Sequence, residues 1–548
     1  MITKQSHERG ANSLQSPLDN AMLASQCTDV ARVYLASNPW AISRAHTSLI
    51  SQCLSQLASS PRAETLLPLS NLLTASNPVS YHVGTGRQLL NYVFDSILTG
   101  LTAVEHELLF VTCFWSKSSS LENLSKTLLE LNRLHPLSRG EDRRRKLRIR
   151  ICISSRSAFQ KLFHTSSDKG YTYANTSRAY QNLGLPPPEK LGNLDIVIKS
   201  KFFRPISVLH GKYVIVDRKR LFLPSCNVSW EEWLEGMGVF EGGIVDSFLE
   251  YYHQTWGSTG GSLQSLSGAQ NNRCTESIWV PNPLPPLSIQ FQRDRLSPTI
   301  FLTQPHHAVF PPLRFVPAAI SKVISTCLPF RISPRIIPAP LTPQNVFMTA
   351  LARQARRSIF IQTPNLTCPD FLEVLYERLT RPGESIDIEI ITCTKMMVLE
   401  QVVTTGLGGP SPKKDGVGGK RRWGATTESC VNELLRLAND NINETSTLSI
   451  YYYTPLPAVS ASSVHDGDVE GRFTAQEEME MARQSHVKAM IVDGEVAVVG
   501  SANGDRASWF TSGEVNVMVL DESFARGVKD SLEKGVGSRR MKVENPFR

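Results

Sequence analysis

A pattern of residue types suited to phosphate chemistry occurs twice in this chain. Both copies fit H-x-K-x4-D-x6-[GP]-S-x-N with the same internal spacing. The members are His210, Lys212, Asp217, Ser225 and Asn227 in the first copy, and His486, Lys488, Asp493, Ser501 and Asn503 in the second. An imidazole can act as nucleophile or as acid and base near neutral pH, and lysine and amide groups can hold phosphate oxygens. Each copy therefore predicts one part of a phosphate-handling site.

The spacing indicates how each copy is arranged on the backbone. The run between lysine and aspartate is apolar in both copies (Tyr-Val-Ile-Val and Ala-Met-Ile-Val), which is typical of a buried strand. Side chains alternate between the two faces of a strand, so the histidine and lysine, two residues apart, are expected to project together. The aspartate falls on the opposite face or on the following turn. This position favours a turn partner over a third catalytic group for Asp217 and Asp493.

The duplicated signature resembles that of the phospholipase D superfamily, the phosphodiesterases with two HKD motifs. The second copy, which continues to Glu514, is the more similar one and resembles bacterial cardiolipin synthases and phospholipases D. The first copy departs in two places: Pro224 replaces the usual glycine, and Gly238 stands where counting from the asparagine places the equivalent of Glu514. Glu235 and Glu241 are close by but out of register, so one imidazole has no identified partner.

The resemblance implies a single site shared by two halves. One imidazole attacks phosphorus to form a phosphohistidine, and the other protonates the leaving alcohol and then activates water or an acceptor alcohol. It implies that His210 is the nucleophile, that His486 is the acid and base, and that Glu514 orients one imidazole. The superfamily motif also includes Asp217 and Asp493, which we keep in the candidate catalytic set.

The remaining motif residues are candidates for binding the substrate phosphate. Lys212, Lys488, Asn227 and Asn503 would hold its non-bridging oxygens. Ser225 and Ser501 either bind phosphate or close a turn, and both interpretations stay open. No carboxylate cluster with metal-ligand spacing is present, so we expect no metal and no other cofactor.

Helix-like and strand-like segments recur around both motifs. Apolar strands at 107–115 and 358–366 each follow an amphipathic helix. This alternation predicts an α/β fold of two tandem phospholipase D-like α/β/α domains related by pseudo-twofold symmetry, each a mixed β-sheet flanked by helices. We expect an N-terminal helical extension packed on the first domain (1–70), the first domain (71–257), a Pro-rich linker (258–340) and the second domain (341–548). The linker should be an extended connector draped over the surface, and its aromatic residues, Phe301 among them, argue that it packs there.

Two basic inserts, 138–145 and 406–424, interrupt the domains. The second is either a solvated loop or a lid or membrane-contacting loop, with Trp423 as an interfacial anchor. Histidines that match no motif are interpreted as surface or satisfied core residues: His82, His253, His306, His307 and His465.

Composition sets the broad class. The 548 residues carry a net charge of +8, which fits an anionic ligand or surface only weakly, and contain no apolar run long enough for a transmembrane helix. The ten cysteines are scattered and the N-terminus lacks a signal-peptide core. We therefore expect a monomeric cytoplasmic protein with reduced cysteines, which would reach a phospholipid substrate by peripheral binding at membranes. The leading prediction is a phosphodiesterase or phosphatidyltransferase acting on phospholipid. The alternatives are a nuclease of the same superfamily, for which nucleic acid would be the partner, and a catalytically silent lipid- or nucleic-acid-binding protein.

Overall fold

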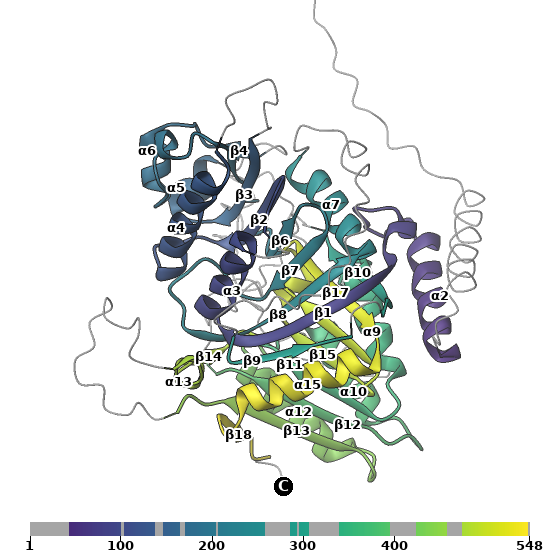
Figure 1. Cartoon of the computed structure of the whole chain (residues 1–548). Helices are drawn as coiled ribbons and strands as arrows, with labels where there is room; N and C mark the ends of the chain where they lie inside the picture. The colour runs from purple at the N-terminus through teal and green to yellow at the C-terminus, as the bar shows by residue number, and fades with distance from the viewer. Residues whose placement is uncertain are drawn as a thin grey trace, which may run out of the picture.

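The computed structural model describes residues 43–99, 103–136, 146–164, 170–203, 207–257, 285–292, 295–305, 339–394, 423–456 and 474–545. These residues form a mixed α/β structure in which helices cover one large mixed β-sheet (Figure 1). The predicted α/β class is confirmed. The basic insert 138–145 and most of the insert 406–424 lie outside the described residues.

The first half of the sheet has three parallel strands followed by antiparallel ones. In spatial order they are β5 (Leu194–Ser200), β3 (Leu147–Ser155), β2 (Glu107–Phe114), β6 (Tyr213–Val216), β7 (Arg220–Pro224), β8 (Trp233–Gly242) and β1 (Leu73–Thr85). A short strand, β4 (Tyr171–Thr172), adds to the edge of β5. Most residues of the central strands are buried, as expected for strands covered on both faces.

The second half repeats this order with its own strands. They are β13 (Thr447–Tyr453), β12 (Asp387–Thr392), β11 (Ser358–Gln362), β15 (Ala489–Val492), β16 (Val496–Gly500), β17 (Glu514–Leu520) and β10 (Ser297–Gln304). Strand β18 (Arg540–Lys542) adds to the edge of β13 as β4 does to β5. Strands β1 and β10 pair with each other and so join the halves in one sheet. The exact domain limits at 71–257 and 341–548 stay a prediction.

Part of the expected surface linker is core structure. Every residue of β10 is buried, and Phe301 at its centre is fully inaccessible to solvent. Strand β9 (Leu287–Gln290) pairs with β1, and β14 (Gln484–Ser485) pairs with β8. The description of 258–340 as an extended surface connector is therefore wrong for residues 297–304. These residues form a buried strand because β1 pairs with one edge of it and β17 with the other.

Capped amphipathic helices cover the sheet. Thr85 and Gln88 form a capping box on the first of them, and Thr342 followed by Pro343 begins its counterpart in the second half. The longer helices are α3 (Gly86–Leu98), α4 (Ser119–Leu134), α7 (Gly243–Trp256), α9 (Pro343–Gln354), α10 (Pro369–Leu379), α12 (Thr427–Asn441) and α15 (Glu522–Val536). The short ones are α5 (Ala158–Phe163), α6 (Ser177–Asn182), α13 (Ala475–Glu480), α14 (Arg506–Phe510), η1 (Leu69–Asn71) and η3 (Pro188–Lys190).

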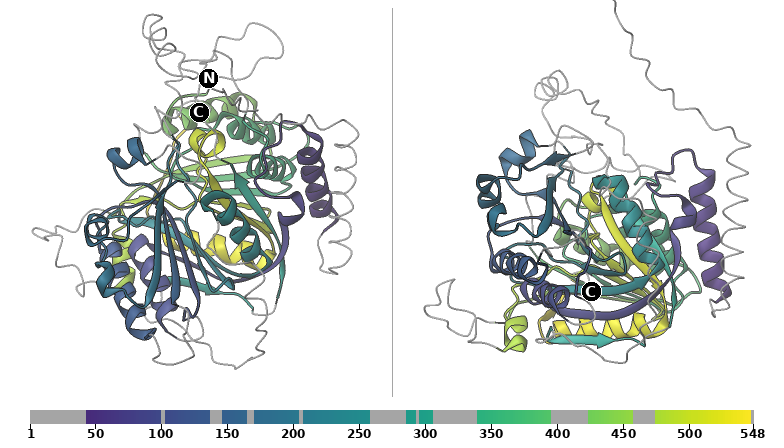
Figure 2. Two further views of the ribbon diagram at one scale, coloured as in Figure 1. Left: turned by 90° about the horizontal axis from the view of Figure 1, so that it is seen from above. Right: turned by 45° about the horizontal axis from the view of Figure 1, so that its top comes forward.

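The N-terminal helix α2 (Arg44–Ser59) packs on the second half, not on the first as expected. It lies beside α9, and Gln354 donates to Gln52 across the contact (Figures 1 and 2). Its buried apolar face includes Leu49, Leu54 and Leu57. The long C-terminal helix α15, yellow in Figure 2, packs against β1, β9 and β16, so elements of both halves share one core.

Trp423 does not serve as a membrane anchor in this structure. Its side chain is 8% exposed and belongs to the apolar core, together with Cys430 and Val431 of α12. The prediction of an interfacial tryptophan at this position is therefore wrong. In the part of the chain that the structure describes, none of the helices combines the length and apolar character needed to cross a bilayer.

Candidate active site

The two His-Lys segments lie directly before buried strands. His210 and Lys212 precede β6, and His486 and Lys488 precede β15, so the apolar runs form the strands as predicted. The strand pairs β6–β7 and β15–β16 then carry Ser225 and Ser501 back toward the histidines. The hairpin is the local reason that residues far apart in each motif come together.

The two aspartates hold the turns at the other end of these hairpins. Asp217, at φ 50°, accepts hydrogen bonds from the backbone N–H groups of Glu105, His106 and Glu107 at 2.7–2.8 Å. Asp493, at φ 56°, does the same for the N–H groups at 356–358, at 2.6–3.1 Å. Each carboxylate thus attaches its turn to the start of the neighbouring parallel strand, β2 or β11. This agrees with a turn partner for both aspartates, and their membership of the catalytic set stays a prediction.

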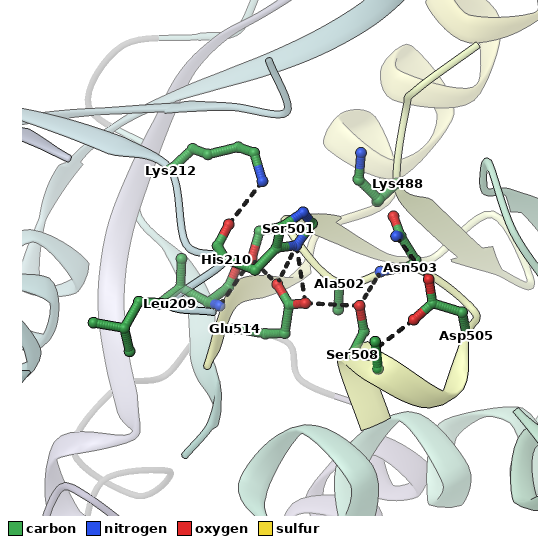
Figure 3. Close-up of polar contacts among 12 residues, drawn as sticks. Leu209, His210, Lys212, Lys488, Ser501, Ala502, Asn503, Asp505, Ser508 and Glu514 are labelled. Carbon is green, nitrogen blue, oxygen red and sulfur yellow. Dashed lines mark hydrogen bonds and ion pairs between the residues drawn. The ribbon is translucent and has the colours of Figure 1, made fainter. Parts of the chain in front are cut away.

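The histidines and their carboxylate partners are exchanged between the halves. His210 Nδ1 lies 2.9 Å from Glu514 Oε1 and 3.0 Å from Oε2 (Figure 3). His486 Nδ1 lies 2.8 Å from Glu235 Oε1. Each half therefore supplies the orienting carboxylate for the imidazole of the other half. A carboxylate at Nδ1 leaves Nε2 as the nitrogen that can react.

Backbone contacts hold the same crossed arrangement. His210 N–H donates to Gly513 O at 2.6 Å, next to Glu514 in the chain. His486 N–H donates to Leu234 O at 2.8 Å, next to Glu235, where β14 lies parallel to β8. The backbone of each histidine is therefore held by the strand that carries its glutamate.

Counting along the chain missed Glu235 because the two copies differ in length. Glu235 follows Asn227 by eight residues, whereas Glu514 follows Asn503 by eleven. The helix α14 fills the longer segment, and no helix stands at the shorter one. Aligning the two copies by the strands that follow, β8 and β17, would have matched the two glutamates. Glu514 is the first residue of β17, and Glu235 is near the start of β8.

The motif serines bind these glutamates. Ser225 Oγ donates to Glu235, and Ser501 Oγ donates to Glu514 at 2.5 Å. Each hydroxyl also accepts the N–H of the residue after its glutamate, at 2.9 Å for Gly236 and 3.0 Å for Val515. The sequence left two roles open for these serines, binding phosphate or closing a turn. The structure favours a different role, in which the serines position the glutamates.

The two carboxylates have different surroundings. Glu514 accepts a further hydrogen bond at 2.7 Å from Ser508 Oγ, which belongs to α14. The shorter first copy has no such helix. Burial raises the pKa of Glu235 to about 8, against the opposing effects of Lys488, Ser225 and Lys212. The Glu235–His486 pair therefore retains a proton at neutral pH.

Both lysines are buried beside the imidazoles. Lys212 Nζ donates to His210 O at 2.7 Å, and Lys488 Nζ donates to His486 O at 2.5 Å. Burial lowers the pKa of Lys488 to about 7, and burial together with the lysine charges lowers the pKa of both imidazoles, most strongly that of His486. Since each ammonium has three donors, one bond to a carbonyl leaves capacity for an anion.

The two asparagines are held differently. Asn227 Oδ1 accepts the N–H of Phe114 at 3.1 Å. Asn503 Nδ2 donates to Asp505 at 2.9 Å, and within the described residues its buried Oδ1 has no partner. Figure 3 shows Asn503 beside Lys488, on the side of the site opposite Lys212. Their role in binding phosphate stays a prediction.

The loop between β7 and β8 adds residues that sequence reasoning did not identify. The Trp233 ring lies 4.9 Å from the His486 ring, centroid to centroid. Glu231 accepts a hydrogen bond from Ser229, and burial raises its pKa while Lys212 and Lys488 oppose that rise. The charges of both lysines thus act on a third carboxylate near the site.

Other candidates lie outside the site. His253 of α7 is not the satisfied residue that we expect from the sequence, because both of its ring nitrogens are buried and have no hydrogen-bond partner within the described residues. His82 is fully buried and bonded to Ser80 and Ser288 at 2.7 and 2.8 Å, as expected for a satisfied core residue. His306, His307 and His465 lie outside the described residues. The seven described cysteines are free and buried. Within the described ranges, the structure has no group of three or more His, Cys, Asp or Glu side chains arranged to hold a metal ion.

Comparisons with known proteins identify a related domain in the second half of the chain. Residues 348–535 match the family model described as "Cardiolipin synthase, PLD-like domain". The minor cardiolipin synthase ClsB of Bacillus subtilis (strain 168) is 43% identical over 62 residues, which is 11% of this chain and 16% of that protein. Thus the chain aligns with only a small part of this curated relative.

Two solved structures are similar at low identity. The phosphatidylserine synthase of Haemophilus influenzae Rd KW20 is 11% identical, with a TM-score of 0.45 over 86% of this chain and 89% of that one. Nuc of Salmonella typhimurium, a phospholipase D family member, is 14% identical, with a TM-score of 0.23 over 37% of this chain and 91% of that one. The family match and the duplicated motif support membership of the phospholipase D superfamily. The second half of the chain carries a PLD-like domain of the cardiolipin synthase type.

Proposed function

We propose that this protein cleaves or exchanges phosphodiester bonds of phospholipids through a phosphohistidine intermediate. The observation that carries the proposal is the crossed pairing of His210 with Glu514 and of His486 with Glu235. It presents two oriented imidazoles and two buried lysines in one site, which is what a two-step displacement at phosphorus requires.

His210 is the nucleophile in this proposal. Burial keeps its imidazole neutral at neutral pH, and its Nδ1–H donates to Glu514, so the Nε2 lone pair is free to attack. Its side chain is 15% exposed, against 2% for His486, so it is the imidazole that substrate reaches more readily.

His486 is the general acid and then the general base. Below about pH 8 the Glu235–His486 pair holds two protons. One lies between the carboxyl and Nδ1, on either atom, and the other lies on His486 Nε2. His210 Nε2 forms a bond to phosphorus as the P–O bond to the leaving alcohol breaks. The proton on His486 Nε2 passes to that alcohol.

The second step reverses these roles. His486 Nε2 removes a proton from water or an acceptor alcohol, whose oxygen attacks phosphorus and releases His210. Lys212 and Lys488 offset the charge on the non-bridging oxygens, with Asn227 and Asn503 as further donors. Hydrolysis and phosphatidyl transfer differ only in which oxygen nucleophile enters.

The substrate class is supported by the family match. The matched model and the Bacillus relative are cardiolipin synthases, so we propose a phospholipid whose leaving or entering group is an alcohol. A phospholipid panel with and without added glycerol, with products followed by mass spectrometry, would identify the headgroup and the acceptor. Products from oligonucleotides but not from phospholipids would instead favour the nuclease alternative.

The two histidine roles can be separated with a soluble p-nitrophenyl phosphodiester. Its phenolate leaves without protonation, so His486→Asn should release one equivalent of p-nitrophenol per site and then stop, because water is not activated. His210→Asn should release none. The assay is run with and without EDTA, and we expect the same burst in both. A burst from His210→Asn and none from His486→Asn would reverse the assignment, and normal turnover by either variant would contradict the shared site.

A further inference from the structure

Three aromatic side chains are unusually exposed on this protein. Phe159, Phe163 and Trp230 are 63%, 64% and 69% exposed, more than any other large apolar side chain in the described residues. Exposed aromatic side chains of this size are unfavourable in water, and grouped ones mark a surface for association.

Phe159 and Phe163 are tied closely to the active site. Both belong to α5, where Gln160 Nε2 donates to Ser154 O at 3.1 Å. Ser154 Oγ in turn accepts the N–H of Leu209 at 2.8 Å. Leu209 is followed in the chain by His210, so α5 lies two hydrogen bonds from the proposed nucleophile.

Trp230 approaches the site by another route. It follows Val228, which pairs with Trp115 at the end of β2. Trp115 N–H donates to Ser155 O at 3.0 Å, just before α5. Three residues after Trp230, the ring of Trp233 covers His486. Trp230 and α5 are thus both attached to the C-terminal end of β2, next to the site.

The exposed rings on α5 form a supported cluster. The Phe159 and Phe163 ring centroids are 4.7 Å apart, and Phe159 lies 5.6 Å from His164. His164 stacks on Tyr171 at 3.6 Å. These ring contacts restrict the exposed phenylalanine side chains, so the side chains lose little conformational freedom when another surface covers them.

The chain around α5 is rich in basic residues. The described residues 156–164 and 170–190 contain four basic side chains, Arg156, Lys161, Arg178 and Lys190, and one acidic side chain, Glu189, whereas Trp230 is followed by two acidic residues at 231–232. Aromatic residues with basic neighbours are the composition of surfaces that insert into the interface of an anionic bilayer.

We propose that Phe159, Phe163 and Trp230, here called the aromatic rim, dock the active site onto the surface of an anionic phospholipid bilayer. This inference rests on the proposed function, because a lipid phosphodiester lies at the bilayer interface and the site must be brought to it. It assigns membrane contact to the first half, and the buried Trp423 takes no part.

The test compares rim variants with a matched control. The variants are Phe159→Ser/Phe163→Ser and Trp230→Ser, and the control is Leu129→Ser/Leu134→Ser, which removes two apolar side chains of α4 that are 40% and 42% exposed. Binding is measured by co-sedimentation with phosphatidylglycerol–phosphatidylcholine vesicles and with phosphatidylcholine vesicles. Turnover of the soluble p-nitrophenyl diester is measured on the same preparations.

Each rim variant should bind the anionic vesicles at least about tenfold more weakly than wild type, with unchanged soluble turnover, while the control binds as wild type does. Phe159→Tyr/Phe163→Tyr should keep most of the binding, because tyrosine also partitions to the interface. Unchanged vesicle binding in both rim variants, or an equal loss in the control, would overturn the inference. Rim-dependent binding by a wild-type protein that turns over neither phospholipid nor the soluble diester would refute the proposed function and leave the docking surface standing.

Discussion

At the scale of single residues, the site depends on two carboxylates that are alike in position and unlike in surroundings. Glu514 is hydrogen-bonded to His210 Nδ1 and accepts from Ser501 and Ser508, whereas Glu235 is hydrogen-bonded to His486 Nδ1 and accepts from Ser225 alone. A carboxylate with fewer donors in a buried place holds its proton more strongly. This difference allows two similar His–Glu pairs to carry out different steps.

The pH dependence should follow from Glu235. Its raised pKa means that the Glu235–His486 pair is protonated below about pH 8 and loses that proton above it. The rate with an alkyl phosphodiester should therefore fall as pH rises through about 8. Glu235→Gln cannot ionise, so it should lower the rate by roughly 100-fold and abolish the limb near pH 8, leaving only the earlier loss of rate as Lys488 loses its charge near pH 7.

Glu514→Gln is the matched variant for this experiment, since it alters the orientation of His210 and leaves the acid pair intact. Its rate should fall while the limb near pH 8 persists. Rate–pH profiles of the three proteins decide the point. A limb near pH 8 that survives in Glu235→Gln would assign the titration to another group.

At the scale of elements, each half positions its His-Lys segment with a β-hairpin whose turn is held by hydrogen bonds to an aspartate. The turn residues Asp217 and Asp493 adopt positive φ and bind three backbone N–H groups each, which fixes the hairpin against β2 or β11. Hydrogen bonds to a charged acceptor are stronger than neutral ones. These hydrogen bonds fix the stability and position of the hairpin, and the proposed catalytic residues lie at its other end.

Asp217→Asn should therefore destabilise the protein without removing a catalytic group. Asparagine tolerates positive φ but has a weaker acceptor, so the free energy of unfolding should fall by roughly 1–3 kcal/mol. Urea unfolding measures the loss, and Asp530→Asn on the exposed face of α15 should change little. A stable Asp217→Asn protein without any burst would place Asp217 in the catalytic set.

At the scale of the whole molecule, the halves form one continuous structure. Strands β1 and β10 pair and so join the two halves of the sheet. Helix α15 packs on strands from both halves, and the N-terminal helix α2 packs against α9 of the second half. The crossed His–Glu pairs lie where these halves meet. Because both crossed contacts occur within a single chain, one molecule should contain a complete site.

Mixing two inactive full-length variants tests this arrangement. His210→Asn and His486→Asn proteins, combined in equal amounts, should show no turnover beyond the sum of the separate proteins. Gel filtration of the mixture records its oligomeric state. Restored turnover would show that the site forms between chains and would contradict the intramolecular arrangement.

Much of this protein could be predicted from its sequence, because local patterns carry local structure. The apolar run after each His-Lys pair is the strand that was expected, and the repeated helix–strand order is the observed fold class. The spacing of Asp217 and Asp493 already favoured turn partners. These features depend on residues close together in the chain.

Only the tertiary structure identified the partner of His486, because that contact joins residues 251 apart and crosses a length difference between the copies. It also placed β10 in the core, α2 on the second half and Trp423 beneath α12, since burial depends on which elements pack together. A sequence shows which residues are able to do chemistry. Long-range packing decides which of them meet, and in this protein it pairs the motif histidine of each half with a glutamate of the other.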